Sequence, residues 1–207
     1  MFDLAAHPVP ATAPGAVTFV GAGPGDPEHL TLKALRALQQ AEVVIHDRLV
    51  GAGVLALANP LAPLIDVGKH GFGPSTAQAD IDALIVAEAQ LGRRVVRLKG
   101  GDCGIFGRLD EEIEALERAG LGWSIVPGLT AAVAAAASIG QSLTRRGRNA
   151  SVRIVTGHDM DGFADQDWRG MAAPGQVTAI YMGRASARFI QGRLLMHGAD
   201  AATADTM

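Results

Sequence analysis

Five short runs rich in β-branched residues alternate with helix-forming stretches, and this alternation constrains the fold more than any other feature of the sequence. The runs are VTFV (17–20), EVVIH (42–46), PLIDV (63–67), RVVRL (94–98) and WSIVP (123–127). Strands that are separated by helices pair in parallel, because each helix returns the chain to the starting edge of the sheet. Residues 16–142 are therefore predicted to form an N-terminal α/β domain in which helices flank a five-stranded, mostly parallel sheet.

Hydroxyl side chains mark the expected starts of two of these helices. Thr31 is expected to cap the helix that follows the first strand, and Ser75 or Thr76 the helix that follows the third. Such side chains accept a hydrogen bond from the first turn of a helix, whose backbone N–H groups lack partners inside it.

A polar and basic segment, QSLTRRGRNA (141–150), separates this region from two further strand patterns, SVRIVTG (151–157) and QVTAIYMG (176–183). We place a domain boundary between residues 142 and 143, and a helical pattern at about 184–197 follows the last strand. Residues 143–207 are thus predicted to form a C-terminal α/β domain. Two strands give their edges few partners, so we expect this domain to be incomplete or to borrow from a second chain.

The composition and charge narrow the class of protein. Hydrophobic residues make up 48% of the 207 residues, which supplies enough apolar surface for folded domains and excludes disorder throughout. The formal net charge of −3 gives no whole-molecule attraction to nucleic acid or to a membrane surface. Any basic binding site must therefore be local.

The sequence shows no sign of a targeting or membrane-spanning segment. Residues 1–15 lack the positive region and the apolar core of a signal peptide, and we expect a flexible tail. The longest apolar stretch, Leu129 to Ile139, is about half of the roughly 20 residues that a bilayer span requires. The single cysteine, Cys103, cannot form an internal disulfide, and we expect it to be a packing residue in a protein of the reducing cytoplasm.

Two glycine-rich loops follow predicted strands, GAGPGD (21–26) after the first and KGGD (99–102) at the end of the fourth. Ligands of open parallel sheets bind outside the carboxyl ends of the strands, so two such loops can wall one pocket. The first loop departs from a dinucleotide fingerprint, because Pro24 removes an N–H and the third glycine comes one residue early. A tight structural turn is the alternative. Asp102 is a candidate for binding a ligand amine or ribose hydroxyl, or else a turn residue and helix cap.

An acid and an amine stand at neighbouring strand ends, Asp47 after the second strand and Lys69 after the third. Such a pair is placed to move protons. A salt bridge of Asp47 with Arg48 or Lys69 is an alternative, and a ribose-binding role for Asp47 is another.

Three arginines gather at the predicted domain boundary, Arg145, Arg146 and Arg148. Arginine grips carboxylates and phosphates in a forked geometry, although a solvated basic linker gives the same pattern. The histidines at 46, 70, 158 and 197 lack the spacing of a metal site, and we expect no metal.

Seven ordered segments together resemble the tetrapyrrole methylase family over residues 17–198, and within it the uroporphyrinogen-III C-methyltransferases. They are VGAGPGDPEHLTLKALRALQQAEVVIHDRLV, VGKHG, VVRLKGGDCGIFGR, VPGLTAA, LTRR, SVRIVTGH and AIYMG. The HDRLV and VGKHG segments favour this group over the later precorrin methylases, the diphthine synthases and the rRNA ribose methylases that share the fold.

The resemblance implies a homodimer of two-domain chains, with S-adenosylmethionine folded into the cleft between the domains. It implies methylation of uroporphyrinogen III at C2 and C7 to give precorrin-2 for sirohaem or cobalamin synthesis, with S-adenosylhomocysteine as product. Nucleic acid and membranes are not expected as partners. The cofactor contacts that it implies are Pro24, Gly100, Gly101, Asp102, Ile105, Thr130, Ala131 and Met182.

By the same resemblance, Asp47 is the proton acceptor and Lys69 the proton donor. Because the substrate carries several carboxylates, five arginines become candidate substrate-binding residues, namely Arg48, Arg108, Arg145, Arg146 and Arg148. Cys103 and Gly104 stand where similar proteins have a proline and a phenylalanine. Two alternatives stay open: a methylase of this fold that acts on another acceptor, a precorrin or RNA, and a truncated, catalytically impaired dimer module that only binds the cofactor.

Overall fold

The computed structural model describes residues 15–68, 76–158, 162 and 165–202. It divides into two compact units, Met1–Ala134 and Ala135–Met207, hereafter unit 1 and unit 2. The division falls inside helix α5, Ala131–Ser138. The boundary expected between residues 142 and 143 stays a prediction.

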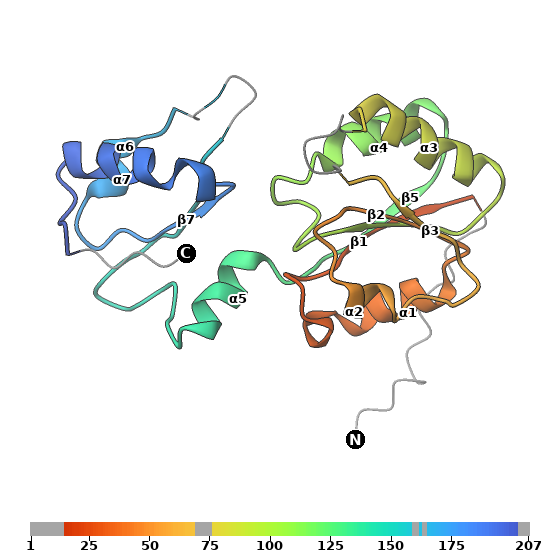
Figure 1. Cartoon of the computed structure of the whole chain (residues 1–207), viewed down its shortest axis with the longest axis horizontal. Coiled ribbons are helices and arrows are strands. Elements are labelled where there is room, and N and C mark those ends of the chain that lie inside the picture. The colour runs from red at the N-terminus through yellow and green to blue at the C-terminus, as the bar shows by residue number, and fades with distance from the viewer. Residues whose placement is uncertain (1–14, 69–75, 159–161, 163–164, 203–207) are drawn as a thin grey trace. The chain divides into compact units, whose positions relative to one another are not determined.

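Unit 1 is built on a five-stranded sheet in which every neighbouring pair of strands is parallel (Figure 1). The strands lie in the order β3-β2-β4-β1-β5. Each expected strand is present, so the predicted fold class is confirmed. Their bounds are Val17–Gly21 for β1, Val43–His46 for β2, Leu64–Asp66 for β3, Val95–Lys99 for β4 and Trp123–Val126 for β5.

Helices cover both faces of this sheet. In Figure 1, α1 and α2 lie against one face, and α3 and α4 against the other. The bounds are Leu32–Gln40 for α1, Ala52–Leu55 for α2, Gln78–Gln90 for α3 and Leu109–Arg118 for α4, with a short 3-10 helix, Pro27–His29, before α1. Strands buried on both faces explain the continuous aliphatic runs of the sequence.

One of the two expected helix caps is present. The Oγ1 atom of Thr31 accepts a hydrogen bond from Ala34 N at 3.1 Å, which confirms the cap of α1. The prediction for Thr76 is wrong: α3 has Ala77 as its N-cap residue and no side-chain cap bond. Thr76 lies one residue too early for its oxygen to reach the first turn. Ser75 lies outside the described residues.

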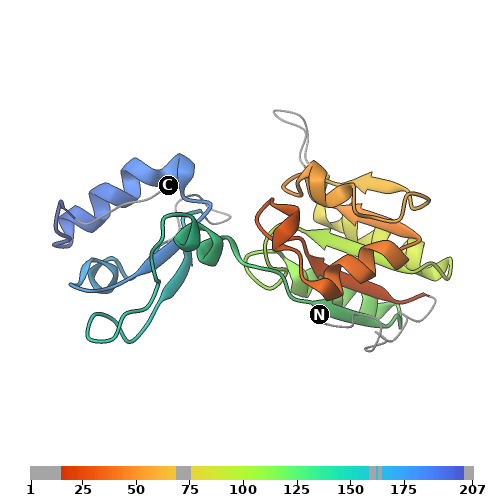
Figure 2. The same cartoon turned by 90° about the horizontal axis from the view of Figure 1, so that it is seen from below.

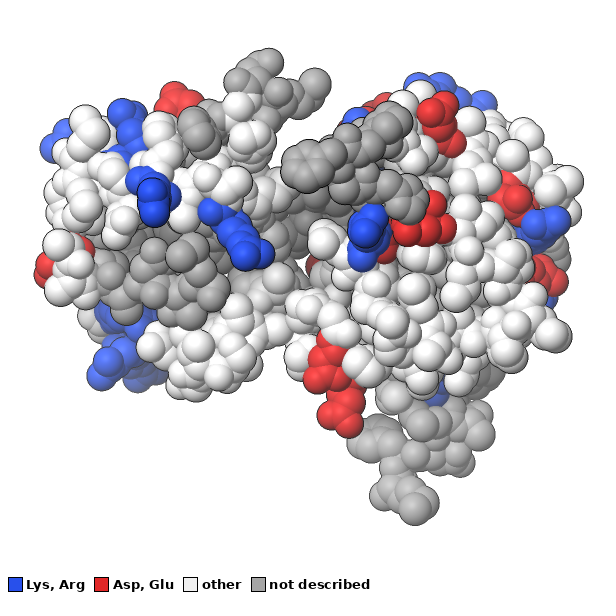
Figure 3. Space-filling model, in the orientation of Figure 1, with Lys and Arg blue, Asp and Glu red and all other residues white. Residues whose placement is uncertain are grey.

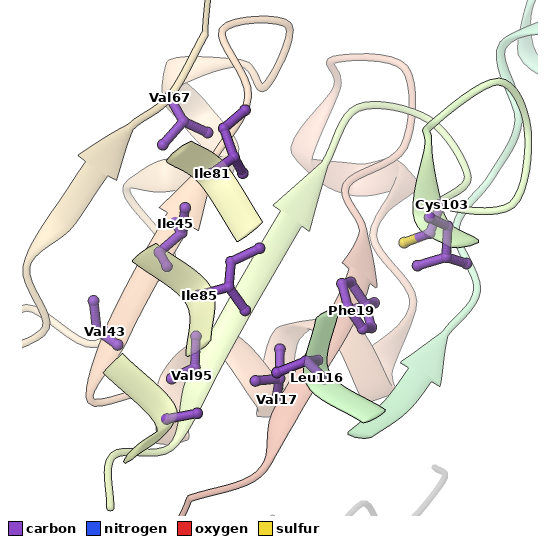
Figure 4. Close-up of a cluster of buried hydrophobic side chains, with 12 residues drawn as sticks. Val17, Phe19, Val43, Ile45, Val67, Ile81, Ile85, Val95, Cys103 and Leu116 are labelled. Atoms are coloured by element: carbon purple, nitrogen blue, oxygen red, sulfur yellow. The ribbon is translucent and has the colours of Figure 1, made fainter. Parts of the chain in front are cut away.

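Each face of the sheet carries its own apolar core, because successive side chains of a strand point to opposite faces. Phe19 and Ile45 face α3 and α4, where they join Ile85 and Leu116 (Figure 4). The other face packs against α1 and α2 through Val20, Val44, Leu98, Leu38 and Val54. Cys103 is fully buried in the first of these cores, which confirms its predicted packing role.

The two strands expected in unit 2 are present as β6 (Arg153–Thr156) and β7 (Thr178–Tyr181), and the structure pairs them in parallel (Figure 2). Trp168, Met171 and Ile190 form its buried core, and the guanidinium carbon of Arg193 lies 5.6 Å from the ring centre of Trp168. The predicted last helix is present as a 3-10 turn followed by α7. The bounds of the helical elements are Trp168–Ala172 for α6, Arg184–Ser186 for the 3-10 turn and Ala187–Met196 for α7.

The surface charge and the length of the helices agree with what the composition indicates. On the face of unit 1 that Figure 3 shows, basic and acidic side chains are interspersed. Among the helices of the described ranges, none combines the length and the apolar character that crossing a membrane demands.

Cys103 should be inert toward thiol reagents in the native protein. Burial, and after it the negative charge of Asp102, raises the pKa of its thiol to about 12. Since the thiolate is the reactive form, labelling at a mildly alkaline pH should be at least ~100-fold slower in the native than in the denatured chain. The rate of reaction with a chromogenic disulfide, measured with and without denaturant, tests this. Equal rates would contradict the packing that Figure 4 shows.

Candidate functional site

The two glycine-rich loops lie side by side at the carboxyl edge of the sheet in unit 1. Because β4 is the neighbour of β1, their carboxyl ends meet, and the loops continue the pairing beyond the strands. Gly23 N donates to Gly101 O at 3.1 Å, and Gly101 N donates to Gly23 O at 2.8 Å. This edge is where open parallel sheets bind their ligands.

A third loop, which follows β5, joins them at Gly128. A Cβ atom on Gly128 would lie 2.2 Å from Gly101 O and 2.7 Å from the Cα atom of Gly21, so only glycine fits there. Gly128 N donates to Oδ2 of Asp102 at 2.9 Å. Nothing in the sequence around Gly128 indicates this close approach, because its neighbours Gly21 and Gly101 lie far from it along the chain.

Asp102 therefore ties two loops together. Its Oδ1 atom accepts from Gly104 N at 2.9 Å, while Oδ2 accepts from Gly128 N. Each carboxylate oxygen can accept a further hydrogen bond, so these contacts leave capacity for a ligand donor. The turn role that was one alternative for Asp102 is present, and its cofactor role stays a prediction.

The other predicted cofactor contacts of unit 1 surround this junction. Pro24 is exposed in the first loop, Gly100 and Ile105 are half-buried in the second, and Thr130 and Ala131 lead into α5. A Cβ atom on Gly101 would meet nothing closer than Ala131 N at 4.0 Å, and one on Gly25 would meet nothing within 4 Å. The junction is thus closed toward Gly21 and Gly128 and open toward Gly25 and Gly101.

Met182, the remaining predicted cofactor contact, belongs to unit 2. It follows β7 directly, is 56% exposed and has a φ of 54°. This left-handed conformation is uncommon for a residue with a side chain, and it costs about 1–3 kcal/mol that neighbouring structure must offset. The strain marks the turn after β7 as a candidate site.

Asp47 stands at the carboxyl end of β2 with its side chain 31% exposed. Its Oδ1 atom accepts from Nη2 of Arg97 at 2.6 Å. The ion pair that the structure shows for Asp47 is thus with Arg97, whereas the partners considered from the sequence were Arg48 and Lys69. Lys69, the predicted proton donor, lies outside the described residues.

Asp47 belongs to a cluster of four charged side chains, which is called the charge cluster below. The other members, Arg97, Lys99 and Glu112, are buried. Glu112 Oε1 accepts from Arg97 Nε at 3.0 Å, and both Glu112 oxygens accept from Lys99 Nζ at 2.9 Å. Arg97, Lys99 and Glu112 are at most 3% exposed. Two cations and two carboxylates balance, which offsets much of the cost of removing these charges from water.

Sequence reasoning missed this cluster, although one signal was present. Arg97 and Lys99 are basic residues within a strand whose other members are aliphatic, and a buried charge requires a partner. Of the carboxylates in α4, Glu112 is the one buried against the sheet.

The predicted substrate arginines differ in what they already bind. Arg48 is exposed next to Asp47. Arg108 is also exposed and grips Glu111 with Nε and Nη2 at 2.7 and 2.6 Å. This hydrogen-bonded pairing raises the pKa of Arg108 and lowers that of Glu111.

Two of the three arginines of unit 2, Arg145 and Arg148, line a surface hollow of about 340 Å³. Arg148 donates to Ser142 O at 3.0 Å, Leu143 O at 3.3 Å and Asn149 Oδ1 at 3.0 Å, so it stabilises the turn itself. Arg145 and Arg146 are exposed. The residues that line the hollow are Gln141, Ser142, Thr144, Arg145 and Arg148.

Metal ligation finds no support in the part of the chain that the structure describes. There, no group of three or more His, Cys, Asp and Glu side chains is arranged to hold a metal ion.

A family model and several known proteins match this chain. The model of the Tetrapyrrole (Corrin/Porphyrin) Methylases matches residues 16–205. A siroheme synthase of Edwardsiella ictaluri is 51% identical over 185 residues, which are 89% of this chain and 40% of that protein. One of Pseudomonas paraeruginosa is 47% identical over 92% of this chain and 41% of its own length. The chain thus spans about two fifths of these relatives.

Solved structures show the same fold over most of the chain. Uroporphyrin-III C-methyl transferase from Thermus thermophilus, in complex with S-adenosylhomocysteine, matches with a TM-score of 0.74 and 41% identity, over 89% of this chain and 73% of that one. The cobalt precorrin-4 methyltransferase CbiF matches with a TM-score of 0.79 and 26% identity, over 93% of this chain and 79% of that one.

Gly128→Ala should disrupt the junction of the three loops. Its Cβ atom would overlap the backbone at Gly101 and Gly21, which cannot move aside without separating the loops. We expect a loss of about 2 kcal/mol in the free energy of unfolding, measured by urea denaturation. Gly122→Ala, where the nearest atom is 4.0 Å away, is the matched control. Equal stability of the two variants would refute the tight junction.

Proposed function

Since the chain belongs to the tetrapyrrole (corrin/porphyrin) methylase family, we propose that it is an S-adenosylmethionine-dependent uroporphyrinogen-III C-methyltransferase. It methylates uroporphyrinogen III at C2 and C7, and precorrin-2 and S-adenosylhomocysteine are the products. The observation that carries this proposal is the pairing of the two glycine loops at the carboxyl edge of the sheet. Support comes from the similar Thermus thermophilus enzyme, which was solved with S-adenosylhomocysteine.

The residues at the loop junction fit the proposed cofactor. The open side at Gly25 and Gly101 permits close approach of a ligand to the backbone, and Asp102 retains acceptor capacity for an amine or ribose hydroxyl. The cofactor contacts in this proposal are Pro24, Gly100, Gly101, Asp102, Ile105, Thr130, Ala131 and Met182. When bound, the cofactor supplies an electrophilic methyl group on a sulfonium sulfur, and the protein supplies alignment.

Proton handling is proposed for the neighbouring strand ends. The pyrrole carbon that attacks the methyl group already carries a side chain, so its methylation leaves a cationic ring. The ring becomes neutral when another atom of the macrocycle loses a proton, and the partly exposed Asp47 carboxylate is the proposed acceptor. Lys69 is the proposed donor, on the strength of the resemblance alone.

The carboxylates of the substrate are proposed to bind arginine side chains. Arg145 lines the hollow of unit 2, Arg146 is exposed next to it in the sequence, and Arg48 is exposed next to Asp47. Arg108 and Arg148 take part less directly, because Glu111 and the turn carbonyls already occupy several of their donors. Forked hydrogen bonding is the property that suits arginine to this task.

We further propose a homodimer in a reducing cytoplasm. The sheet of unit 2 has two described strands, β6 and β7, whose outer edges can pair with more chain. The buried thiol of Cys103 is compatible with a reducing compartment.

Binding and turnover test this function together. Titration calorimetry with S-adenosylmethionine and with S-adenosylhomocysteine should give heat with both. When the protein is then incubated with fresh uroporphyrinogen III, it should transfer methyl groups from S-adenosylmethionine to this substrate. If a folded sample gives no heat with S-adenosylmethionine or with S-adenosylhomocysteine, the proposal is contradicted. If methyl groups are transferred to RNA and not to uroporphyrinogen III, the proposed substrate is wrong and RNA is the methyl acceptor.

Asp47→Asn should lower kcat by about 100-fold and leave the dissociation constant of S-adenosylhomocysteine within a factor of about two, because the residue is assigned to proton transfer. Asp66→Asn, at the end of the neighbouring strand β3, is the matched control and should retain activity. Steady-state kinetics and calorimetry measure the two effects. A parallel loss of turnover and affinity would move Asp47 into the cofactor site.

A further inference from the structure

We propose that Arg97 is a positioning residue for the methyl transfer reaction, because it holds the Asp47 carboxylate in a fixed orientation at the edge of the sheet. The inference rests on the proposed function, which makes Asp47 the proton acceptor.

The guanidinium group of Arg97 is held on several sides. It lies on β4, whose neighbours are β2 and β1, and its Nη2 atom donates to Asp47 Oδ1 at 2.6 Å. Nε donates to Glu112 Oε1 at 3.0 Å, and Nη1 donates to Leu98 O at 3.3 Å. A planar group with three anchored nitrogens cannot rotate freely, so the position of Asp47 Oδ1 is fixed by the strand beside it.

The far side of the cluster fixes Arg97 in turn. Lys99 Nζ donates to both Glu112 oxygens at 2.9 Å, and Gln78 Nε2 donates to Oε1 at 3.4 Å. Glu112 therefore has one preferred orientation, in which Oε1 faces Arg97. The contacts form a chain from α4 through β4 to the carboxyl end of β2.

The burial of the side chains shows which end of this series of contacts meets the solvent. The side chains of Arg97, Lys99 and Glu112 are at most 4% exposed, whereas that of Asp47 is 31% exposed. Apolar side chains of similar volume would fill the same space at no desolvation cost. The three buried charged groups thus lead to one accessible carboxylate. This arrangement is expected if the buried groups hold that carboxylate in one orientation.

Arg97→Lys is the first test, because lysine keeps the charge and loses the fork. We expect kcat to fall at least ~10-fold while the dissociation constant of S-adenosylhomocysteine and the KM for uroporphyrinogen III stay within a factor of about two. Arg94→Lys is the matched control. Arg94 precedes β4 and pairs with Glu42 at the opposite edge of the sheet, so its replacement should leave kcat unchanged.

A double-mutant cycle separates positioning from general support of the fold. In the Asp47→Asn background, Arg97→Lys should change kcat less than twofold, because its effect passes through the carboxylate already removed. If the two losses multiply instead, or if Arg97→Lys leaves kcat intact in the wild-type background, the inference is overturned.

Urea unfolding supplies a readout that does not depend on turnover. Arg97→Gln and Asp47→Asn should each lower the urea midpoint, and the double variant should lower it by less than the sum of the two shifts. A wild-type chain that binds S-adenosylhomocysteine without methylating uroporphyrinogen III would defeat the proposed function. The unfolding cycle then decides only whether Arg97 holds Asp47: non-additive shifts support this contact, and additive shifts overturn it together with the inference. The same cycle decides it if Arg97→Lys fails to fold.

Discussion

The close approach of three loops at the carboxyl edge of the sheet is the constraint on which the rest of unit 1 depends. The order of the strands places β4 and β5 on either side of β1, so the loops that follow these three strands must converge. Gly21 and Gly128 permit the convergence, because a Cβ atom on either would overlap backbone atoms of the other and the carbonyl oxygen of Gly101. Asp102 then fastens the junction through two backbone N–H groups. On the other side, a Cβ atom on Gly25 would meet nothing within 4 Å, so a ligand can approach the backbone closely there.

A single strand organises both the core and the candidate chemistry. Along β4, Val95 joins the core beneath α3 and α4, and Arg97 and Lys99 share its face because side chains alternate. Val96 and Leu98 point to the opposite core. The strand thus contributes aliphatic packing on one side and, on the other, the cations that meet Glu112. Arg97 of β4 contacts Asp47, the candidate proton acceptor, and the loop that follows β4 forms part of the loop junction.

The sequence predicted the elements well and the contacts between them poorly. The five strands were recognisable because buried parallel strands read as aliphatic runs, and the Thr31 cap because it is a local interaction. The Thr76 cap was misplaced, since helix starts shift by a residue. The partners Arg97 and Glu112 lie on different elements, and only the packing of α4 on β4 brings them together. The close approach at Gly128 was likewise not predictable locally, because its neighbours Gly21 and Gly101 belong to the ends of β1 and β4.

A crystal structure of the chain with bound S-adenosylhomocysteine would test the proposed cofactor site most directly. The account requires the ligand to lie against the backbone of the two glycine turns, with its polar groups within hydrogen-bonding distance of this backbone and the Asp102 carboxylate. Density for the ligand at any other edge of either sheet, or loop side chains filling the open side of the junction, would contradict it.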